Sequence, residues 1–529
     1  MKNYFLKFFF LIIAILITFI IFLSTKGFET DNFNNQIKNV IYKSNNNLNV
    51  ELKKIQLKLN PINFNINAKT VGAKISYKEI SLPLEYIKIR ISALSLIKKK
   101  ITSSKLEIST RSILLRDLIG LIRSISNKPE LILLEKSIKK GQAIINIDLT
   151  LDENGKIRQD YQINAILKDA KVGILKKYNF EKINFLLNAN DNIFNFKDLS
   201  FTSNKSDFYL ENLKIIKDKK NYFIEGDIQN KNSVMNNELL KLFNINFNNI
   251  EISNINYDSK NIFSFNINNK FKIKNIAIDS DIYIYNLDYK RPTFFNDYLQ
   301  NDQDTFQIKD HKVKLIFKKD NLAIDGSGLI KIENKFDDIR YKINLKNNDI
   351  NLTSSLRLSE LKLNKQEYLR SIFPKLDKVI SLKDQQIEID YKNNDLNIKG
   401  EGEIKFSNEF EQINFNILRT KNKYKFNTKI DLEKTLLHIN FLNFEKKDNL
   451  KTKIDISGNY NSNKAINLKK FSISNKNNKM ILEDLLINNI NQIVKVEKID
   501  LDFFDNQNKK NKILLKKVKD NNYKIDGQI

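Results

Sequence analysis

The sequence predicts a mostly β protein, in which one N-terminal transmembrane helix precedes a long, curled antiparallel sheet that forms a groove, with a few short helices. Three observations lead to this prediction. The N-terminus carries an uncharged apolar run, apolar and polar residues alternate along most of the remaining chain, and Asn- and Asp-rich turns separate the alternating segments. Alternation with a period of two is typical of antiparallel strands that have one apolar and one solvated face.

Composition narrows the class of protein. The 529 residues are 41% hydrophobic and 29% charged, which is enough apolar material for a folded body and excludes disorder, collagen and a polytopic membrane protein. The absence of Cys excludes disulfide scaffolds, zinc fingers and thiol nucleophiles. The net charge of +27 is spread along a chain rich in Lys, Asn and Ile, the bias of a very AT-rich genome. We therefore interpret the charge as a solvated surface and predict no nucleic-acid partner.

Residues 8–25 form the predicted transmembrane helix. They contain no charged side chain, follow Lys2 and Lys7, and would span about 27 Å as a helix, close to the hydrocarbon core of a bilayer. The positive-inside rule leaves residues 1–7 in the cytoplasm and exports the rest. A cleaved signal peptide is the alternative, but no Ala-x-Ala site lies near Ser24, so we predict an uncleaved anchor. Its membrane-facing residues are Phe8, Phe9, Phe10, Leu11, Ile12, Ile13, Ile15, Leu16, Ile17, Phe19, Ile20, Ile21, Phe22 and Leu23.

The alternating pattern begins near Leu48, after a short amphipathic helix predicted between Asp31 and Tyr42. Turns rich in Asn and Asp, such as Lys319–Asn321 and Lys392–Asp395, separate the strands. Three alternating segments supply the candidate residues of the apolar face, which are Phe263, Phe265, Ile267, Val313, Leu315, Phe317, Ile339, Tyr341, Ile343 and Leu345.

Helical patterns are few, and each interrupts the run of strands. They cover Ser92–Lys98, Leu114–Ser126, Glu238–Phe243 and Glu367–Val379. A parallel sheet would need a helix after nearly every strand, which leaves one continuous sheet or a set of sandwiches. The scarcity of Gly and Pro linkers favours continuity, with candidate boundaries at Lys217–Asn221 and Asn301–Asp304.

A glycine pattern recurs along the chain. Leu322–Ile332 resembles Leu396–Phe406, each with a Gly-x-Gly, and shorter echoes surround Gly226, Gly458 and Gly527. Glycine inside a strand permits a bend or bulge, so repeated glycines can curl a sheet into a trough. Neither Gly-x-Gly opens a helical pattern, which argues against a phosphate-binding loop.

Several of these features together resemble one protein family. They are the single anchor, the strand set ending in Ile87–Ile101, the strand, turn and Gly units, the segment Lys140–Leu149 with Asn154–Gly155, and the end at Asn522–Gly527. This pattern resembles the AsmA-like envelope proteins of bacteria, the YhdP and TamB type of bridge-like lipid-transfer protein. The resemblance implies an AsmA-like N-terminal region over residues 26–135 and an extended β-groove over residues 136–529. Larger members continue past the strand-like Ile525–Ile529, so a short member and a longer chain both remain open.

The resemblance also implies a location and a function. The protein would be anchored in the bacterial inner membrane, extend through the periplasm, and conduct phospholipid to the outer membrane in support of its biogenesis. The candidate face would bury acyl chains at about 0.8 kcal/mol per CH₂, while headgroups stay in solvent. Its partners would be membrane phospholipids, the inner membrane and outer-membrane components. Two alternatives remain, a closed sandwich core and a scaffold that binds outer-membrane protein strands by β-augmentation without conducting lipid.

Signals of catalysis are lacking. His311 and His438 fall in separate strand patterns, and the sequence holds no His-Glu-x-x-His, Gly-x-Ser-x-Gly or Walker motif. Acidic pairs such as Asp337–Asp338 are typical of a solvated face. We therefore predict that the protein is not an enzyme and has no catalytic residue, bound metal or cofactor.

Overall fold

The structure is a computed structural model. It describes residues 2–32, 34–35, 38, 48–77, 80–92, 105–126, 129–150, 152, 158, 160–174, 178–218, 221–235, 252–268, 272–291, 293, 296, 299, 304–347, 349–364, 375–377, 379–407, 409–421, 423–439, 444–447, 449–461, 466–488, 493–504, 507, 509–519 and 522–528.

The chain forms two compact units. The first comprises Met1–Ser233 with Lys260–Ile276, and the second comprises Val234–Ser259 with Ala277–Ile529. Both boundaries expected from the sequence are wrong. Lys217–Asn221 lies inside the first unit, where Asp218 pairs with Asn221 across a hairpin, and Asn301–Asp304 belongs to the second unit. At the first place the chain joins two paired strands of one unit, so the run of Lys residues there does not mark a domain boundary. At the second place only Asp304 is among the described residues.

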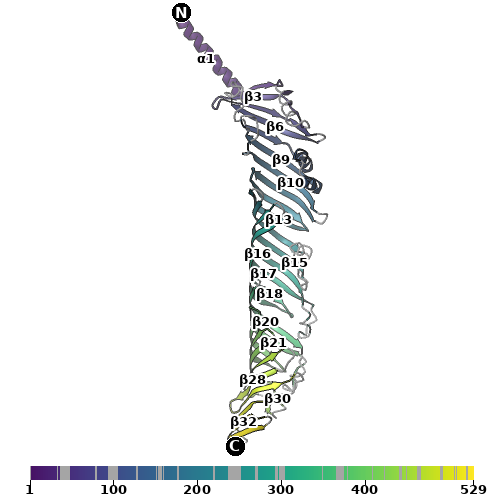
Figure 1. The fold of residues 1–529 in the computed structure, drawn as a ribbon, viewed down its shortest axis with the longest axis vertical. Coiled ribbons are helices and arrows are strands. Elements are labelled where there is room, and N and C mark those ends of the chain that lie inside the picture. The colour runs from purple at the N-terminus through teal and green to yellow at the C-terminus, as the bar shows by residue number, and fades with distance from the viewer. Residues whose placement is uncertain are drawn as a thin grey trace. The chain divides into compact units, whose positions relative to one another are not determined.

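The first unit begins with one long helix and continues with strands and two short helices (Figure 1). Its elements are α1 (Lys2–Thr25), β1 (Phe28–Thr30), β2 (Leu48–Glu51), β3 (Ile55–Asn60), β4 (Asn65–Val71), β5 (Lys74–Tyr77), β6 (Ile80–Ser92), β7 (Lys105–Thr110), β8 (Ile113–Leu114), α4 (Leu115–Ser126), α5 (Pro129–Ser137), β9 (Ile138–Thr150), β10 (Gln162–Ile174), β11 (Tyr178–Ala189), β12 (Ile193–Ser203), β13 (Ser206–Asp218) and β14 (Asn221–Met235). β15 (Ile252–Asn268) and β16 (Ile273–Lys290) contribute residues to both units.

Among the described residues, the remaining elements of the second unit are strands. They are β17 (Thr305–Lys318), β18 (Asn321–Lys331), β19 (Phe336–Lys346), β20 (Asp349–Asn364), β21 (Val379–Lys392), β22 (Asp395–Lys405), β23 (Phe410–Thr420), β24 (Lys423–Leu432), β25 (Leu437–Ile439), β26 (Phe444–Lys446), β27 (Thr452–Asn461), β28 (Ile466–Asn475), β29 (Lys479–Ile487), β30 (Ile493–Lys495), β31 (Lys498–Phe504), β32 (Lys510–Lys519) and β33 (Asn522–Gln528).

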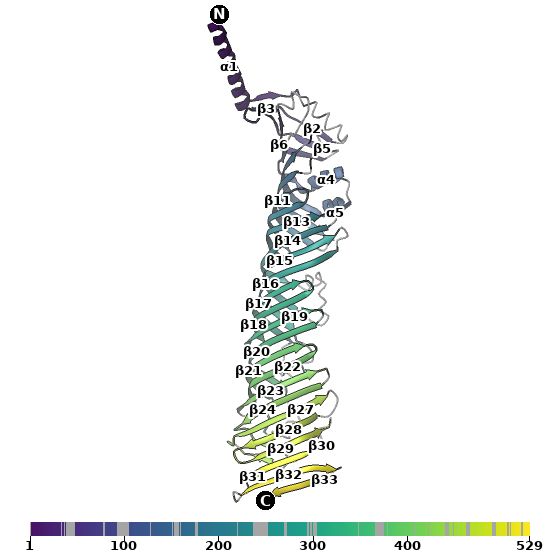
Figure 2. The ribbon, with the colours of Figure 1, turned by 60° about the vertical axis from the view of Figure 1, so that its left-hand side comes forward.

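The predicted fold class is confirmed. Among the described residues, 31 strands belong to one antiparallel sheet that is not closed on itself, and β25 pairs with β26 in a separate sheet of two strands. Most neighbouring strands are also neighbours in the sequence, as in the run from β17 to β24, which Figure 2 shows in chain order. The predicted turns lie in these hairpins, and Lys319, Asp320, Asn393 and Asn394 all have a positive φ.

The predicted helices have mixed outcomes. The helix expected at Leu114–Ser126 is α4, although Leu114 itself ends strand β8. Helix α5, a short helix that begins at Pro129, is not among the predicted helices. The prediction that the helix from Glu367 extends to Val379 is wrong, because Val379 begins β21 and pairs with Asn364. The other predicted helices lie mostly or wholly outside the described residues, as do Phe33, Ile37, Val40 and Ile41 of the amphipathic segment.

The predicted anchor corresponds to α1, which begins at Lys2 and so includes most of the short stub before the apolar run. Its segment from Asn3 to Thr25 has a mean hydropathy of 3.0 and is long and apolar enough to cross a membrane. None of that segment is buried against the rest of the protein. All fourteen predicted membrane-facing residues, from Phe8 to Leu23, lie on this helix.

Candidate apolar groove

The second unit has a continuous apolar face, which is defined by the register of β17 to β20. Residues directly opposite each other on paired strands share a face of the sheet. One such row is Phe317, Leu322, Leu345 and Ile350, and the next is Leu315, Ile324, Ile343 and Leu352. We call the side that carries these rows the apolar face. Its side chains are mostly half-buried, whereas the opposite side presents exposed residues such as Lys312, Arg340 and Lys342.

The structure places seven of the ten candidate residues together on this face. Val313, Leu315 and Phe317 lie on β17, and Ile339, Tyr341, Ile343 and Leu345 lie two strands away on β19, with β18 between them. The other three, Phe263, Phe265 and Ile267, lie on the part of β15 that belongs to the first unit. There the rings of Phe263 and Phe265 stack with centroids 5.9 Å apart, as expected for residues that share a face.

Bulges keep the apolar residues on one face along the whole of a strand. The pairing of β17 with β18 shifts by one residue between Lys309 and Lys312, and Asp310 has a φ of 49°. An extra residue in a strand reverses the alternation beyond it. Phe306 and Ile308 therefore face the same side as Val313 and Leu315, although their sequence positions differ in parity. The Gly-x-Gly of β18 predicted an irregularity of the sheet at this point. The extra residue lies on the neighbouring strand β17, where Asp310 adopts a left-handed backbone conformation.

The same arrangement recurs 74 residues later (Asp310 to Asp384). In the pairing of β21 with β22 the register shifts between Lys383 and Gln386, and Asp384 again has a φ of 49°. Buried acids also recur, because Asp337 accepts hydrogen bonds from the backbone N–H and the hydroxyl of Ser359, and Glu411 accepts three from the backbone of residues 433–435. The glycine pattern in the sequence therefore marks a structural repeat, here called the first repeat (305–352) and the second repeat (379–426).

Glycines of the repeat make room for aromatic rings on the apolar face. A Cβ atom at Gly326 would lie 2.2 Å from the ring of Tyr341, which is directly opposite on β19. In the second repeat Gly400 lies against Phe415 in the same way. Two further glycines, Gly458 and Gly226, lie outside the repeats, against the rings of Phe426 and Phe263 respectively. An aromatic ring over a strand glycine covers exposed backbone and adds apolar surface.

His311 is a polar group on the apolar face at the bulge of β17. It is 2% exposed, stacks on Tyr341 with ring centroids 5.5 Å apart, and leaves Nδ1 without a hydrogen-bond partner. Burial lowers the pKa of His311, because the charged imidazolium would lose its hydration. Burial likewise raises the pKa of Tyr341. The second repeat has Gln385 at the position of His311, where its amide donates to the Glu403 carbonyl at 2.8 Å. His438 lies on β25, paired opposite Glu445.

Part of the apolar face is covered. In the second unit Leu437 and Ile439 of β25 pack with Ile404, Ile430 and Ile454 in a fully buried core. The fully buried Lys446 fastens this hairpin, since its Nζ donates to the carbonyls of Glu433 at 2.8 Å, Thr435 at 2.9 Å and Lys447 at 3.2 Å.

In the first unit helix α4 has the equivalent role. Leu115, Leu118 and Leu121 pack against a core of buried residues that includes Leu82 and Leu167. The apolar face of the second unit is thus closed where β25 packs and half-exposed along β17 to β20.

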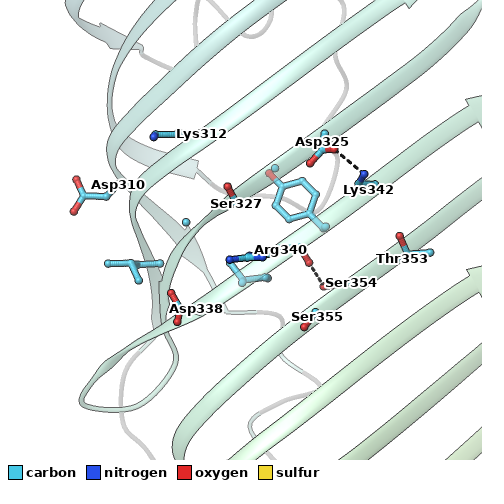
Figure 3. A pocket seen from close by; sticks show the side chains of 15 residues that line it. Asp310, Lys312, Asp325, Ser327, Asp338, Arg340, Lys342, Thr353, Ser354 and Ser355 are labelled. Atoms are coloured by element: carbon cyan, nitrogen blue, oxygen red, sulfur yellow. Dashed lines mark hydrogen bonds and ion pairs between the residues drawn. The ribbon is translucent and has the colours of Figure 1, made fainter.

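A polar hollow of about 670 Å³ lies beside the bulge of the first repeat, lined largely by side chains from the opposite side of the sheet (Figure 3). Lys342 forms an ion pair with Asp325 at 3.2 Å, and the Ser354 hydroxyl donates to the Arg340 carbonyl at 3.1 Å. Of the ten candidates only Ile339 and Tyr341 line it. Its charged side chains comprise three acids and three bases, so it has no strong preference for an ion of either sign. The acids and bases are Asp310, Lys312, Asp325, Asp338, Arg340 and Lys342.

Among the described residues, no three or more His, Asp or Glu side chains are grouped so that they could hold a metal ion. The acidic pairs noted in the sequence have other roles. Asp337 is buried and accepts hydrogen bonds from Ser359, whereas Asp338 is exposed. Asp502 pairs with Lys510 at 3.4 Å.

Comparison with known proteins leaves the family open. No family model matches the sequence, and no curated protein matches it.

Half of the residues in the two apolar rows are not among the candidates predicted from the sequence. Leu322, Ile324, Ile350 and Leu352 complete the two rows that the candidate residues begin. Their own alternation is visible in the sequence, and the hairpin turns at Lys319–Asp320 and Asn347 fix the register that brings them opposite the candidates. Counting back from the turns would therefore have found these four residues.

Proposed function

We propose that this protein is a membrane-anchored carrier that holds phospholipid acyl chains on its apolar sheet face and conducts them between the inner and outer membranes. The observation that carries the proposal is the half-exposed apolar face of β17 to β20, where two complete rows of apolar side chains run across four strands. A folded protein seldom leaves such a surface uncovered unless an apolar ligand or partner uses it. The resemblance to AsmA-like envelope proteins supports the same function.

The physical basis is transfer of hydrocarbon out of water. Each CH₂ group that leaves water for the apolar face contributes about 0.8 kcal/mol, so an acyl chain is held without any specific polar contact. Because apolar residues lie opposite one another from β17 to β20, an acyl chain can move along this part of the face without crossing a charged side chain. The opposite side carries Lys, Arg and Asp residues and stays hydrated.

Helix α1 supports a proposed location for the protein. We propose that α1 remains as an anchor in the inner membrane, with Lys2 and Lys7 on the cytoplasmic side and the sheet in the periplasm. The natural chain has no Cys, so one introduced cysteine reports topology without background. Lys312→Cys on the polar side should react with a membrane-impermeant maleimide in cells with a permeabilised outer membrane and an intact inner membrane. Lack of reaction until the inner membrane is also broken would contradict this topology.

Photo-crosslinking of the full chain in its host membrane tests lipid binding. A benzoylphenylalanine placed at Leu315 or Ile343 should form adducts with phospholipid, whereas the same group at the neighbouring Lys314 or Asn344 should not. These pairs differ by one position and face opposite sides of the same strand, so expression level and distance from the membrane are matched. Leu315→Asp should abolish the adduct formed at Ile343.

The outcomes separate this proposal from the scaffold alternative. Lipid adducts equal on both sides, or absent from both, would refute a lipid-holding face. Adducts of the Leu315 and Ile343 positions with outer-membrane proteins in place of lipid would favour a scaffold that binds protein strands.

A further inference from the structure

The two repeats of the second unit differ in the polarity of the residues next to their hairpin turns. The row next to the hairpin turns, called the rim row, consists in the first repeat of Phe317, Leu322, Leu345 and Ile350. The equivalent rim row of the second repeat, 74 residues later (Leu345 to Arg419), consists of Tyr391, Leu396, Arg419 and Tyr424. Three of four apolar residues are thus replaced by residues with polar ends, while Leu396 retains the apolar character of its counterpart Leu322.

Arg419 lies on the apolar face. It is directly opposite Leu396 on one side and Tyr424 on the other, and it follows Ile417 by two positions on β23. Directly opposite residues have Cβ atoms about 5 Å apart, so the three side chains are neighbours. The turn begins two residues after Arg419, which puts its guanidinium at the edge of the face, away from the core that β25 covers.

The guanidinium of Arg419 carries a buried, unsatisfied donor. Its Nε atom is buried and makes no hydrogen bond, and within the described part of the chain no carboxylate forms an ion pair with it. Arg340, by contrast, lies on the polar side of β19, and the repeat replaces it with Asn414. A half-buried cation with an unsatisfied donor is costly to keep, which points to an anionic ligand that completes it.

The surroundings favour an amphiphilic anion. The rings of Tyr424 and Tyr460 lie with their centroids 6.0 Å apart and their planes tilted by 44°. The Tyr391 hydroxyl donates to the Asn394 side chain at 2.8 Å. Aromatic rings with a polar tip suit a boundary between hydrocarbon and water. Lys421 and Lys423, both exposed, add positive charge at the same turn. Apolar residues Ile398, Phe415 and Ile417 continue from the rim row toward the middle of the strands.

We propose that Arg419 binds the phosphate of a phospholipid headgroup, with Tyr391 and Tyr424 flanking it and the acyl chains lying along the apolar face below. This inference rests on the proposed function and specifies the lipid class, a phosphate-bearing lipid in preference to a neutral one. Guanidinium suits this role because its fork of N–H donors matches two phosphate oxygens. The first repeat, with its fully apolar rim row, offers passage to the chains without holding the headgroup.

The repeat supplies its own matched variants. Arg419→Leu introduces the residue that the first repeat has at the equivalent position, Leu345, so the fold of the repeat accommodates it. Arg419→Lys keeps the charge but loses the paired geometry. Arg340→Asn, which installs the counterpart residue Asn414 on the polar side, removes the same charge from the same part of the repeat without touching the apolar face. Protease resistance of each full-length variant confirms that it folds.

Native mass spectrometry of the full chain in detergent micelles provides the test. The micelles contain equal amounts of phosphatidylglycerol and diacylglycerol, with acyl chains that differ in mass enough to separate the adducts. We expect the ratio of phosphatidylglycerol to diacylglycerol adducts to fall about tenfold in Arg419→Leu, equivalent to about 1.4 kcal/mol. The fall should be smaller in Arg419→Lys and absent in Arg340→Asn, and diacylglycerol adducts should persist in all of them.

Each outcome separates the two proposals. Adducts present with an unchanged ratio in Arg419→Leu would refute the headgroup site and leave the lipid-holding face intact. Absence of any lipid adduct from the wild-type chain would refute the proposed function itself. Loss of the lipid preference on addition of 10-fold molar excess of inorganic phosphate over lipid would show a site for free phosphate and overturn the assignment to a lipid headgroup.

Discussion

Ile343→Asp tests whether the apolar face is open. Ile343 is half-buried between Ile324 and Leu352. Full burial of such a side chain contributes about 1.5–3 kcal/mol, so loss of a half-buried one costs about 1–1.5 kcal/mol. On an open face the new carboxylate remains hydrated and adds little further cost. The total should be about 1–2 kcal/mol.

Ile454→Asp provides the contrast, because Ile454 is 3% exposed in the core that β25 covers. There the full transfer free energy is lost and a carboxylate must be buried, so the cost should be about 4 kcal/mol or more. Asn344→Asp, one residue from Ile343 on the exposed side, serves as the surface control and should change stability by less than about 0.5 kcal/mol.

Hydrogen exchange of the full chain, followed by mass spectrometry of peptides from β18 to β20 and from β27, measures the local cost. A loss of 1–2 kcal/mol should speed exchange in β18 to β20 roughly 5- to 30-fold, whereas Ile454→Asp should speed exchange in β27 about a thousandfold. Equal acceleration by Ile343→Asp and Ile454→Asp would refute an open face, because it would place Ile343 in a closed core.

Three further predictions concern other parts of the second unit. Since burial lowers the pKa of His311, the unfolded chain binds a proton near the ordinary value of 6.5 while the folded chain stays neutral, so stability should be full above pH 6.5 and fall as the pH decreases through it. Thermal unfolding from pH 7.5 to 5.5 should show a shallower fall for His311→Gln, and parallel curves would contradict this account. Lys446→Met removes three hydrogen bonds to carbonyls and should lower local stability by about 3 kcal/mol, seen as faster amide exchange in β25 and β26; unchanged exchange would argue against the fastening role. Gly458→Val would place Cβ about 2.4 Å from the backbone carbonyl of Asn467 and should lower the melting temperature far more than Gly173→Ala, whose nearest contact is a side-chain atom at 3.2 Å; similar melting temperatures would show that β28 yields easily.

The repeat explains how a chain of simple composition builds a differentiated surface. Asp310 and Asp384 shape the two bends alike, and Gly326 and Gly400 admit an aromatic ring alike. Against this constant background a few substitutions stand out, above all Leu345 to Arg419. Internal repetition therefore provides a control within one sequence.

Much of the architecture follows from the sequence alone. Period-two alternation and turns such as Lys319–Asp320 specify antiparallel hairpins, because the side-chain period of a strand and the positive φ of turn residues are local properties. The apolar run at residues 8–25 likewise specifies α1, because the length and hydropathy of one continuous segment are local properties. Seven of the ten candidate groove residues share a face because alternation and adjacent hairpins together determine it.

Other features depend on tertiary structure. Asp310 looks like any polar strand residue in the sequence, and only the pairing with β18 shows that it forms a bulge and reverses the alternation. Whether the apolar face is covered depends on β25 and Lys446, which act across the strands and leave no periodic signal. The position of Arg419 on that face likewise follows from register. Local periodicity determines what each strand presents, and long-range pairing determines what each side chain meets.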